Sequence, residues 1–170
     1  MNTFILRWNP NISSYKMETH LEVVEQAKKM EFPESFDWSV FEWQKVKDGD
    51  MVVLLQVGTD SDGIAMIGKI KGKPEADKSW REDGSKDHYV YIEIFDAYNP
   101  SEFKELLAEN FENEFDKIKW HKGHSGELID KATADRLFKK LIPIIHRSGH
   151  MYAYDIENFI ENGWRIVYND

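Results

Sequence analysis

Cysteine is absent from the 170 residues of the chain. Disulfide bonds, thiol nucleophiles and cysteine-ligated zinc sites are therefore excluded, and the composition suits a reducing compartment. No apolar run approaches the ~20 residues that a membrane-spanning helix needs. The first ten residues, MNTFILRWNP, also lack the cationic and apolar regions of a signal peptide. We therefore expect a soluble, cytoplasmic protein that has no membrane partner.

Positive charge is in short supply, because 22 lysines and arginines stand against 31 aspartates and glutamates, for a formal net charge of -9. Proteins that bind nucleic acid by broad neutralisation of phosphates present basic surfaces instead. Lysines do gather locally in residues 68–78 and 116–124. Each cluster alone is more typical of solvated lysines between acidic neighbours.

The usual catalytic signatures are missing as well. The sequence contains no P-loop, G-x-S-x-G or HExxH motif, and no glycine fingerprint for dinucleotides. His121 and His124, in the stretch WHKGHSGELI, could hold a metal only with a third ligand from elsewhere in the chain. Histidines in a glycine-containing loop more often bond to backbone or water. We therefore predict no metal and no other cofactor, and we favour a protein that is not an enzyme.

The residue pattern predicts an α+β fold. Apolar and alternating runs indicate strands, amphipathic spacing indicates helices, and the runs at 51–58 and 64–72 should pair as an antiparallel hairpin. Residues 73–87 are expected to form a long polar connection, Trp38 and Phe41 to face inward, and Pro143 to end or kink the last helix. One domain with a small barrel or a strongly curled sheet of five to six strands follows. The expected strands are residues 4–8, 51–58, 64–72, 88–98 and a short one that ends the stretch 120–129. The expected helices are 17–30, 99–111 and, within 130–149, an amphipathic helix through Ile142; the tail after 149 should form a short helix and a final strand.

Tryptophan is abundant, with six in the chain, and three of them lie in or beside polar, loop-like segments: Trp38, Trp80 and Trp120. Aromatic rings at a cleft stack on flat ligands, with ~1–3 kcal/mol per stacked base as a typical value. The alternative for any single tryptophan is that it completes the core. Trp43 and Trp164 are interpreted as structural.

The order of the motifs resembles the EVE domain of the PUA-like superfamily, and more closely the bacterial EVE-type modules that are often found beside restriction enzymes. The resemblance spans roughly residues 4–142. It rests on FILRWNP, DWSVFEW, VKDGDMVVLLQVG followed by DGIAMIGKI, YVYIEIFD, and WHKGHSGELI before a helix with ATADRLFKKL.

The resemblance implies a PUA-like curled mixed β-barrel with flanking helices over residues 1–145, and a C-terminal extension, 146–170, packed on the same domain. EVE modules are similar to the YTH readers of methylated adenine and are associated with modified cytosine in DNA. The implied function is a non-enzymatic nucleic-acid-binding module that recognises a modified, flipped-out base in an aromatic pocket. A separate nuclease or other effector protein would be its partner.

The resemblance also implies which residues form the site. Trp38 and Trp80 correspond to the two aromatic walls, and Ser125 with Gly126 to a turn that approaches the ligand closely. Trp8 stands where other EVE domains have a small residue. The implied ligand-binding residues are Trp8, Asn9, Trp38, Ser39, Trp80, Trp120, Ser125 and Gly126, and the implied phosphate contacts are His121, Lys122 and His124.

Three alternatives stay open at this point. The same pocket could bind a free nucleoside or another flat metabolite, which fits the negative charge better. An ASCH-type hydrolase of the PUA-like group would need a lysine and a carboxylate in the pocket, for which Lys45 and Glu42 are the candidates. Surface tryptophans could instead meet a protein partner. The sequence does not distinguish DNA from RNA.

Overall fold

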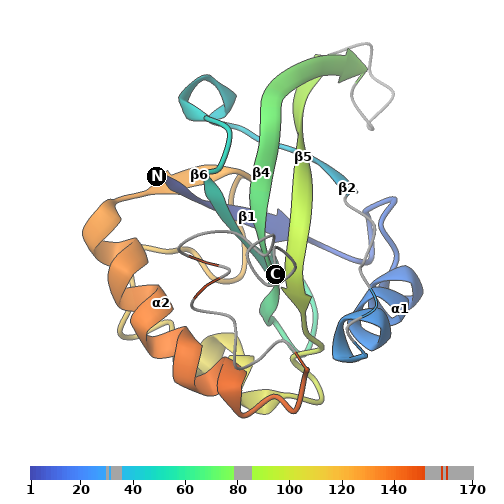
Figure 1. Ribbon diagram of the computed structural model, residues 1–170, viewed down its shortest axis with the longest axis vertical. Coiled ribbons are helices and arrows are strands. Elements are labelled where there is room, and N and C mark those ends of the chain that lie inside the picture. Colours follow the sequence, from blue (N-terminus) through green and yellow to red (C-terminus); the bar gives the residue numbers. More distant parts are fainter. Residues whose placement is uncertain (30, 32–35, 79–85, 152–157, 159, 161–170) are drawn as a thin grey trace, which may run out of the picture.

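Six strands and two α-helices make up the fold in the part of the chain that the computed structural model describes, residues 1–29, 31, 36–78, 86–151, 158 and 160 (Figure 1). The helices lie on different sides of the sheet, and the paired ends of β4 and β5 project beyond the rest of the molecule. The strands are β1 (Thr3–Trp8), β2 (Phe36–Ser39), β3 (Met51–Gln56), β4 (Gly63–Lys78), β5 (Lys86–Ala97) and β6 (Glu127–Ile129), and the helices are α1 (Met17–Lys28) and α2 (Lys131–His146).

The strands form one mixed sheet in the order β2-β5-β4-β3-β1-β6. β1 runs parallel to β3, and the other neighbouring strands are antiparallel. The register shifts within β3–β4 and within β4–β5, and irregularities of this kind bend a strand and increase its twist. The expected α+β, PUA-like fold with a curled mixed sheet is confirmed, and so is the antiparallel hairpin of β3 and β4.

The curl brings the two edges of the sheet together. After β2, the backbone N–H groups of Phe41 and Glu42 donate to the carbonyls of Ser125 and Gly126, at 2.8 and 3.1 Å, just before β6. The Glu42 carboxylate also accepts a hydrogen bond from the backbone of Leu128, at 2.5 Å. These contacts satisfy backbone groups that an open edge would expose, and they join residues more than eighty positions apart in the chain.

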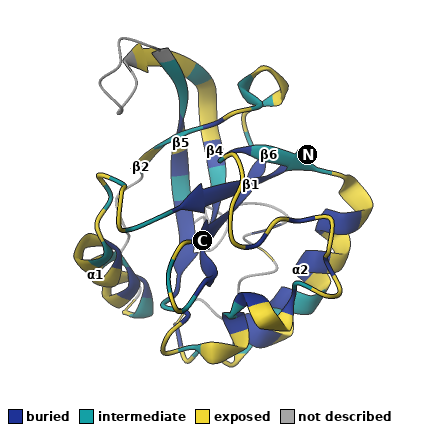
Figure 2. Ribbon diagram, turned by 180° about the vertical axis from the view of Figure 1, so that it is seen from behind, coloured by how far each residue is buried: buried dark blue, intermediate teal, exposed yellow. Residues whose placement is uncertain are grey.

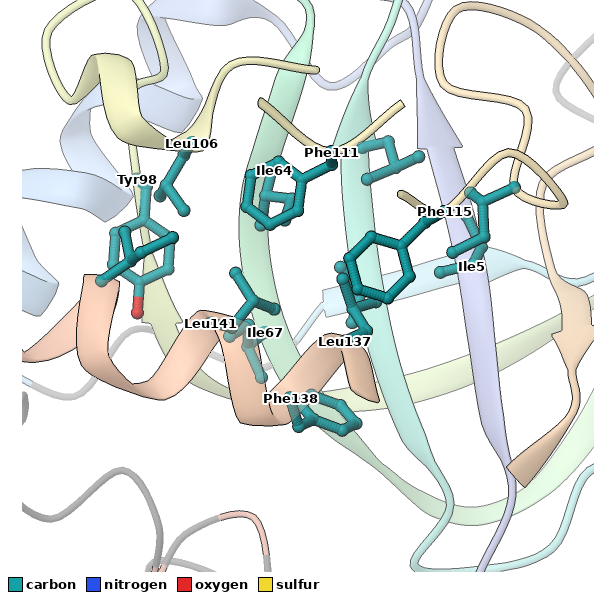
Figure 3. Packing of buried hydrophobic residues seen from close by; sticks show 14 of the residues in the cluster. Ile5, Ile64, Ile67, Tyr98, Leu106, Phe111, Phe115, Leu137, Phe138 and Leu141 are labelled. Atoms are coloured by element: carbon teal, nitrogen blue, oxygen red, sulfur yellow. The ribbon is translucent and has the colours of Figure 1, made fainter. Parts of the chain in front are cut away.

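Apolar side chains cover both faces of the sheet. Phe4, Leu6 and Trp8 enter the cluster under α1, whereas Ile5 enters the other cluster, so β1 is buried on both faces. Figure 2 shows the central strands as buried, the far end of β4 as largely exposed and the paired end of β5 as intermediate. Figure 3 shows Leu137, Phe138 and Leu141 of α2 packing against Ile64 and Ile67 of β4, with Phe111 and Phe115 contributed by the chain before β6.

Several expectations about elements are wrong, each for a tertiary reason. Residues 99–111 form two short 3₁₀ turns, because the Ala108 N–H bonds to the carbonyl of Asp62 and Leu107 bridges to Gly63. Residues 73–78 extend β4 instead of forming a loop, and residues 36–39 form a strand that the pattern did not predict.

Pro143 lies inside α2, which continues to His146 because Leu141, Ile144 and Ile145 are buried on either side of the proline. Phe41 is 57% exposed and does not face inward. The expected short helix and last strand of the tail fall almost entirely outside the described residues. Neither helix in the described ranges combines the length and the apolar character that crossing a membrane requires.

Candidate ligand-binding site

A cavity of about 610 Å³ opens where the two sheet edges meet. Its walls come from the end of β1 and the following loop, from β2, and from the loop of residues 121–125, with Val57 and Tyr89 completing the lining. Cavities that bind small molecules in proteins have volumes of about 300–1,000 Å³. The cavity therefore has the size of a site for a small molecule.

Aromatic rings form one wall of the cavity. Tyr15 and Phe36 are nearly parallel, with ring centroids 5.5 Å apart at 13°. Trp38 stands edge-on to both, at 5.9 Å from Tyr15 and 5.5 Å from Phe36. Trp8 also borders the cavity, although it is fully buried and donates its Nε1 hydrogen to the carbonyl of Tyr15 at 2.7 Å. Such a wall offers both ring faces and ring edges to a ligand.

Ser125 supplies the polar group beside this wall. Its Oγ accepts hydrogen bonds from Trp38 Nε1 at 2.8 Å and from the backbone N–H of Arg7 at 2.9 Å. A hydroxyl has two lone pairs and one hydrogen, so both acceptor positions are used, and among the described residues nothing accepts its hydrogen. Ser125 thus fixes the Trp38 ring and keeps one donor for a ligand in the cavity.

The loop of residues 119–127 is held in place by Arg7 from β1. The guanidinium donates to the carbonyl of Lys119 from Nε and Nη2, at 3.0 and 2.9 Å, and from Nη1 to the carbonyl of His124. Nη1 also pairs with Glu127 at 2.6 Å. Burial lowers the pKa of Arg7, and the charge of Glu127 opposes this shift. A buried cation with this many acceptors makes the loop a rigid part of the site.

A buried histidine positions Tyr15. His20 Nε2 lies 2.8 Å from the carbonyl of Tyr98, which can only accept, so Nε2 carries the hydrogen and Nδ1 accepts from the Tyr15 hydroxyl at 2.9 Å. Burial lowers the pKa of His20 and raises the pKa of Tyr15. Both shifts favour the neutral forms that this pair of hydrogen bonds requires.

Two histidines lie at the mouth of the cavity. His121 Nδ1 is 2.7 Å from Asp62 and Nε2 is 2.9 Å from Glu112, and these hydrogen bonds, led by the one to Asp62, raise the pKa of His121. His124 stacks on Phe41 with ring centroids 4.0 Å apart. In the described ranges, no three histidine, aspartate or glutamate side chains are grouped so that they could hold a metal ion.

Most of the residues singled out from the sequence and placed by the structure border the cavity, namely Trp8, Asn9, Trp38, Ser39, His121, Lys122, His124 and Ser125. Trp80, the implied second wall, lies outside the described residues. Trp120 does not border the cavity: it is 3% exposed, packs at 5.3 Å on Phe111 in the main core, and donates to the carbonyl of Phe115.

Gly126 packs against the backbone of Val40 and Phe41 and does not line the cavity. Its φ is +90°, and a Cβ there would lie 2.6 Å from the Cα of Val40. The candidate catalytic pair, Lys45 and Glu42, does not line the cavity either. Its two side chains form an ion pair with each other at 2.7 Å. The hydrogen bond from Lys45 is the main cause that lowers the pKa of Glu42.

Sequence reasoning missed the residues Arg7, Tyr15, Phe36, Asp37 and Tyr89. Arg7 carries a visible signal, a single charge within a buried strand, since such a charge needs partners. Tyr15 is an aromatic residue at the end of the polar loop NPNISSY. Phe36, Asp37 and Tyr89 border the cavity because β2 pairs with β5, which the pattern did not predict.

Comparison with known proteins agrees with the fold. No protein-family model matches the chain, and no curated protein sequence matches it. Among solved structures, the YTH domain-containing protein Mmi1 in a complex with RNA is 12% identical with a TM-score of 0.50, over 86% of this chain and 84% of that chain. Another structure of the Mmi1 YTH domain is 15% identical with a TM-score of 0.50, over 86% and 91% of the two chains. The chain therefore shares the fold of YTH domains.

Proposed function

We propose that the chain is a reader of nucleic acid that holds one flipped-out, modified nucleobase in this cavity and catalyses no reaction. The observation that carries the proposal is the pairing of the Trp38 ring with the Ser125 hydroxyl at the cavity wall. A stacking surface and a fixed donor are the two elements that recover the free energy of unstacking a base.

Modified cytosine in DNA is the base that we propose. The exocyclic amino group of cytosine is a donor that aspartate or glutamate accepts, and Asp37, an exposed carboxylate, borders the cavity. The free hydrogen of Ser125 suits the ring nitrogen or carbonyl oxygen on the same edge of cytosine. The resemblance to EVE modules supports the same base.

Nucleic acid as the partner is supported by the shared fold, since one of the YTH domains with this fold is in a complex with RNA. A reader without a catalytic group needs a second protein to act on the marked site. We propose a separate nuclease or other effector for that role.

A free modified nucleoside is the second candidate ligand. The net charge of -9 favours it, because a nucleoside carries no phosphate for an acidic protein to repel. The two candidates differ in one respect: only a nucleic-acid reader gains affinity when the base is placed within an oligonucleotide.

Tryptophan fluorescence titration tests the proposal. Short oligonucleotides carry cytosine, 5-methylcytosine, 5-hydroxymethylcytosine or N6-methyladenine, in DNA and RNA, and 5-methyl-2′-deoxycytidine serves as the free nucleoside. The wild type should bind the 5-methylcytosine DNA in preference to the unmodified one. Trp38→Ala should weaken binding by about 5- to 150-fold, the equivalent of ~1–3 kcal/mol for one stacked base.

Two variants sharpen this result. Trp43→Ala removes a tryptophan that stacks on His88 outside the cavity lining, so it controls for the lost fluorophore and should bind like the wild type. Asp37→Asn replaces the carboxylate acceptor and should reduce the preference for the cytosine probes over the N6-methyladenine probe. Absence of a response to every oligonucleotide at low salt, together with a response to the nucleoside, would replace the reader with the second candidate.

A further inference from the structure

Phe41 and His124 form an exposed pair of stacked rings beside the cavity. Their centroids are 4.0 Å apart and their planes differ by 7°. His124 is exposed and borders the cavity, whereas Phe41 does not border it and is 57% exposed. Full burial of a phenylalanine side chain is worth ~1.5–3 kcal/mol. Because Phe41 is largely exposed, its side chain contributes little of this free energy, whereas the side chain of its neighbour Val40 is buried.

Both rings are carried by backbone that is fixed in place. The Phe41 N–H donates to the carbonyl of Ser125 at 2.8 Å, and a Cβ on Gly126 would lie 2.8 Å from the Phe41 nitrogen. On the other side, the carbonyl of His124 accepts from the buried guanidinium of Arg7. The backbone that carries both rings is therefore held by the hydrogen bonds that close the sheet and by Arg7.

One residue sets the position of this pair relative to the cavity. The side chain of Ser125 holds the Trp38 ring, and its backbone carbonyl holds Phe41. His124 borders the same cavity as Trp38 and Ser125, so the Phe41–His124 pair lies beside a ligand held there. Lys122, which is exposed and borders the cavity, lies two residues from His124 and offers a charge to a phosphate.

We propose that the Phe41–His124 pair is a second stacking site, which holds the nucleobase adjacent in the strand to the one in the cavity. The inference rests on the proposed function, because it requires a base in the cavity. The class of ligand is any neighbouring nucleobase, since every base has a π-face and stacking is tolerant of sequence. The second site thus adds affinity for the strand, and the cavity selects the modification.

The test compares three probes in a mutant cycle. The first is 5-methyl-2′-deoxycytidine, the second is a single-stranded pentanucleotide with a central 5-methylcytosine between thymines, and the third is the same pentanucleotide with abasic residues on both sides of the 5-methylcytosine. The wild type should bind the second probe about 5- to 150-fold more tightly than the third. In Phe41→Ala the affinities for the second and third probes should become equal, and the affinity for the nucleoside should stay unchanged.

Further variants separate stacking from other effects. Phe41→Trp should keep the ratio, and Phe41→Leu should lose it although it keeps an apolar side chain. Tyr91→Ala is the matched control, because Tyr91 is another exposed ring, 46% exposed, that does not border the cavity. Far-UV circular dichroism and melting temperatures establish that each variant folds, and Phe41→Leu carries the test if Phe41→Ala does not fold.

The outcomes are distinct for the two proposals. If the wild type binds the nucleoside and the pentanucleotides, and the ratio of affinities for the second and third probes is the same in Phe41→Ala, the second stacking site alone is overturned. Loss of nucleoside binding in Phe41→Ala also overturns it, because the ring would then act through the cavity. A wild type that binds none of the three probes overturns the proposed reading of modified cytosine, and with it the second site.

Discussion

Ser125 and His121 both border the cavity, yet the sequence gives very different information about them. The resemblance places Ser125 at a close turn, but the use of both its lone pairs by Trp38 and Arg7 follows only from the fold. His121 suggests a metal or a phosphate contact in the sequence, whereas its two nitrogens face Asp62 and Glu112. Those carboxylates are 59 and 9 residues away, so spacing alone could not identify them as its partners.

His121 should make stability depend on pH. Its pKa in the folded protein is raised above the ordinary value of 6.5 by the hydrogen bonds to Asp62 and Glu112. A raised pKa stabilises the fold fully below about pH 6.5, and this contribution is lost as the pH rises through the folded-state pKa. His121→Gln should therefore melt at a lower temperature than the wild type at pH 5.5, and the difference should shrink toward pH 9.

Thermal melts across this range measure the difference, and an NMR titration reports the pKa directly. Asp62→Asn should lower the pKa of His121 more than Glu112→Gln does, because the hydrogen bond to Asp62 is the larger cause. A melting difference between wild type and His121→Gln that stays constant from pH 5.5 to 9 would contradict the assignment.

Elements with strong local signals were predicted well, and elements that depend on distant partners were not. The apolar run of β3 and the amphipathic spacing of α1 are local, and the structure has both. Residues 99–111 also have helical spacing, but Asp62 and Gly63 capture the backbone of Leu107 and Ala108. β2 is only four residues long, and it forms because β5 offers an edge. Sequence periodicity carries no information about such an edge.

The N-terminus of α2 provides a test at this scale. Asp130 caps the helix, accepting from the backbone of Thr133 at 2.9 Å and from its hydroxyl at 2.8 Å. Asp130→Ala should destabilise the protein, because the first turn of the helix loses its cap, and should lower the melting temperature by about 1–8 °C for a protein of this size.

Asp130→Ser and Asp130→Asn are the matched controls, because each keeps a side-chain oxygen that can cap the helix. Urea titration gives the free energies of unfolding. An Asp130→Ala variant as stable as Asp130→Ser would show that the cap contributes nothing.

At the scale of the whole molecule, the net charge limits how the proposed nucleic-acid ligand could bind. The net charge of -9 argues against a broad basic surface, and the Arg7 guanidinium at the cavity is committed to Glu127 and to carbonyl groups. Lys122 is the exposed lysine in the cavity lining. Affinity should therefore come from stacking and base contacts, with one or two phosphates neutralised at most.

The salt dependence of binding measures this directly. For single strands, log K falls with log salt with a slope of about -0.7 per neutralised phosphate, so a slope between about -0.7 and -1.4 is expected. Lys122→Ala should make the slope shallower by about 0.7. Lys139→Ala, an exposed lysine on α2, should leave it unchanged. A slope steeper than about -3 would mean that a larger phosphate-binding surface has been missed.

The closure of the sheet, where residues 41–42 bond to residues 125, 126 and 128, also determines when the cavity can form. The hydrogen bonds from Arg7 and Trp38 to Ser125 span 118 and 87 residues of chain. Contacts of such long range form slowly, because the entropy of closing the loop is lost before the contact stabilises anything. During synthesis the N-terminal strands leave the ribosome first. The Trp38 ring therefore lacks its hydrogen bond to Ser125 until the chain beyond residue 125 has also left the ribosome. A newly made chain therefore has no complete cavity wall until residue 125 has joined the strands that precede it.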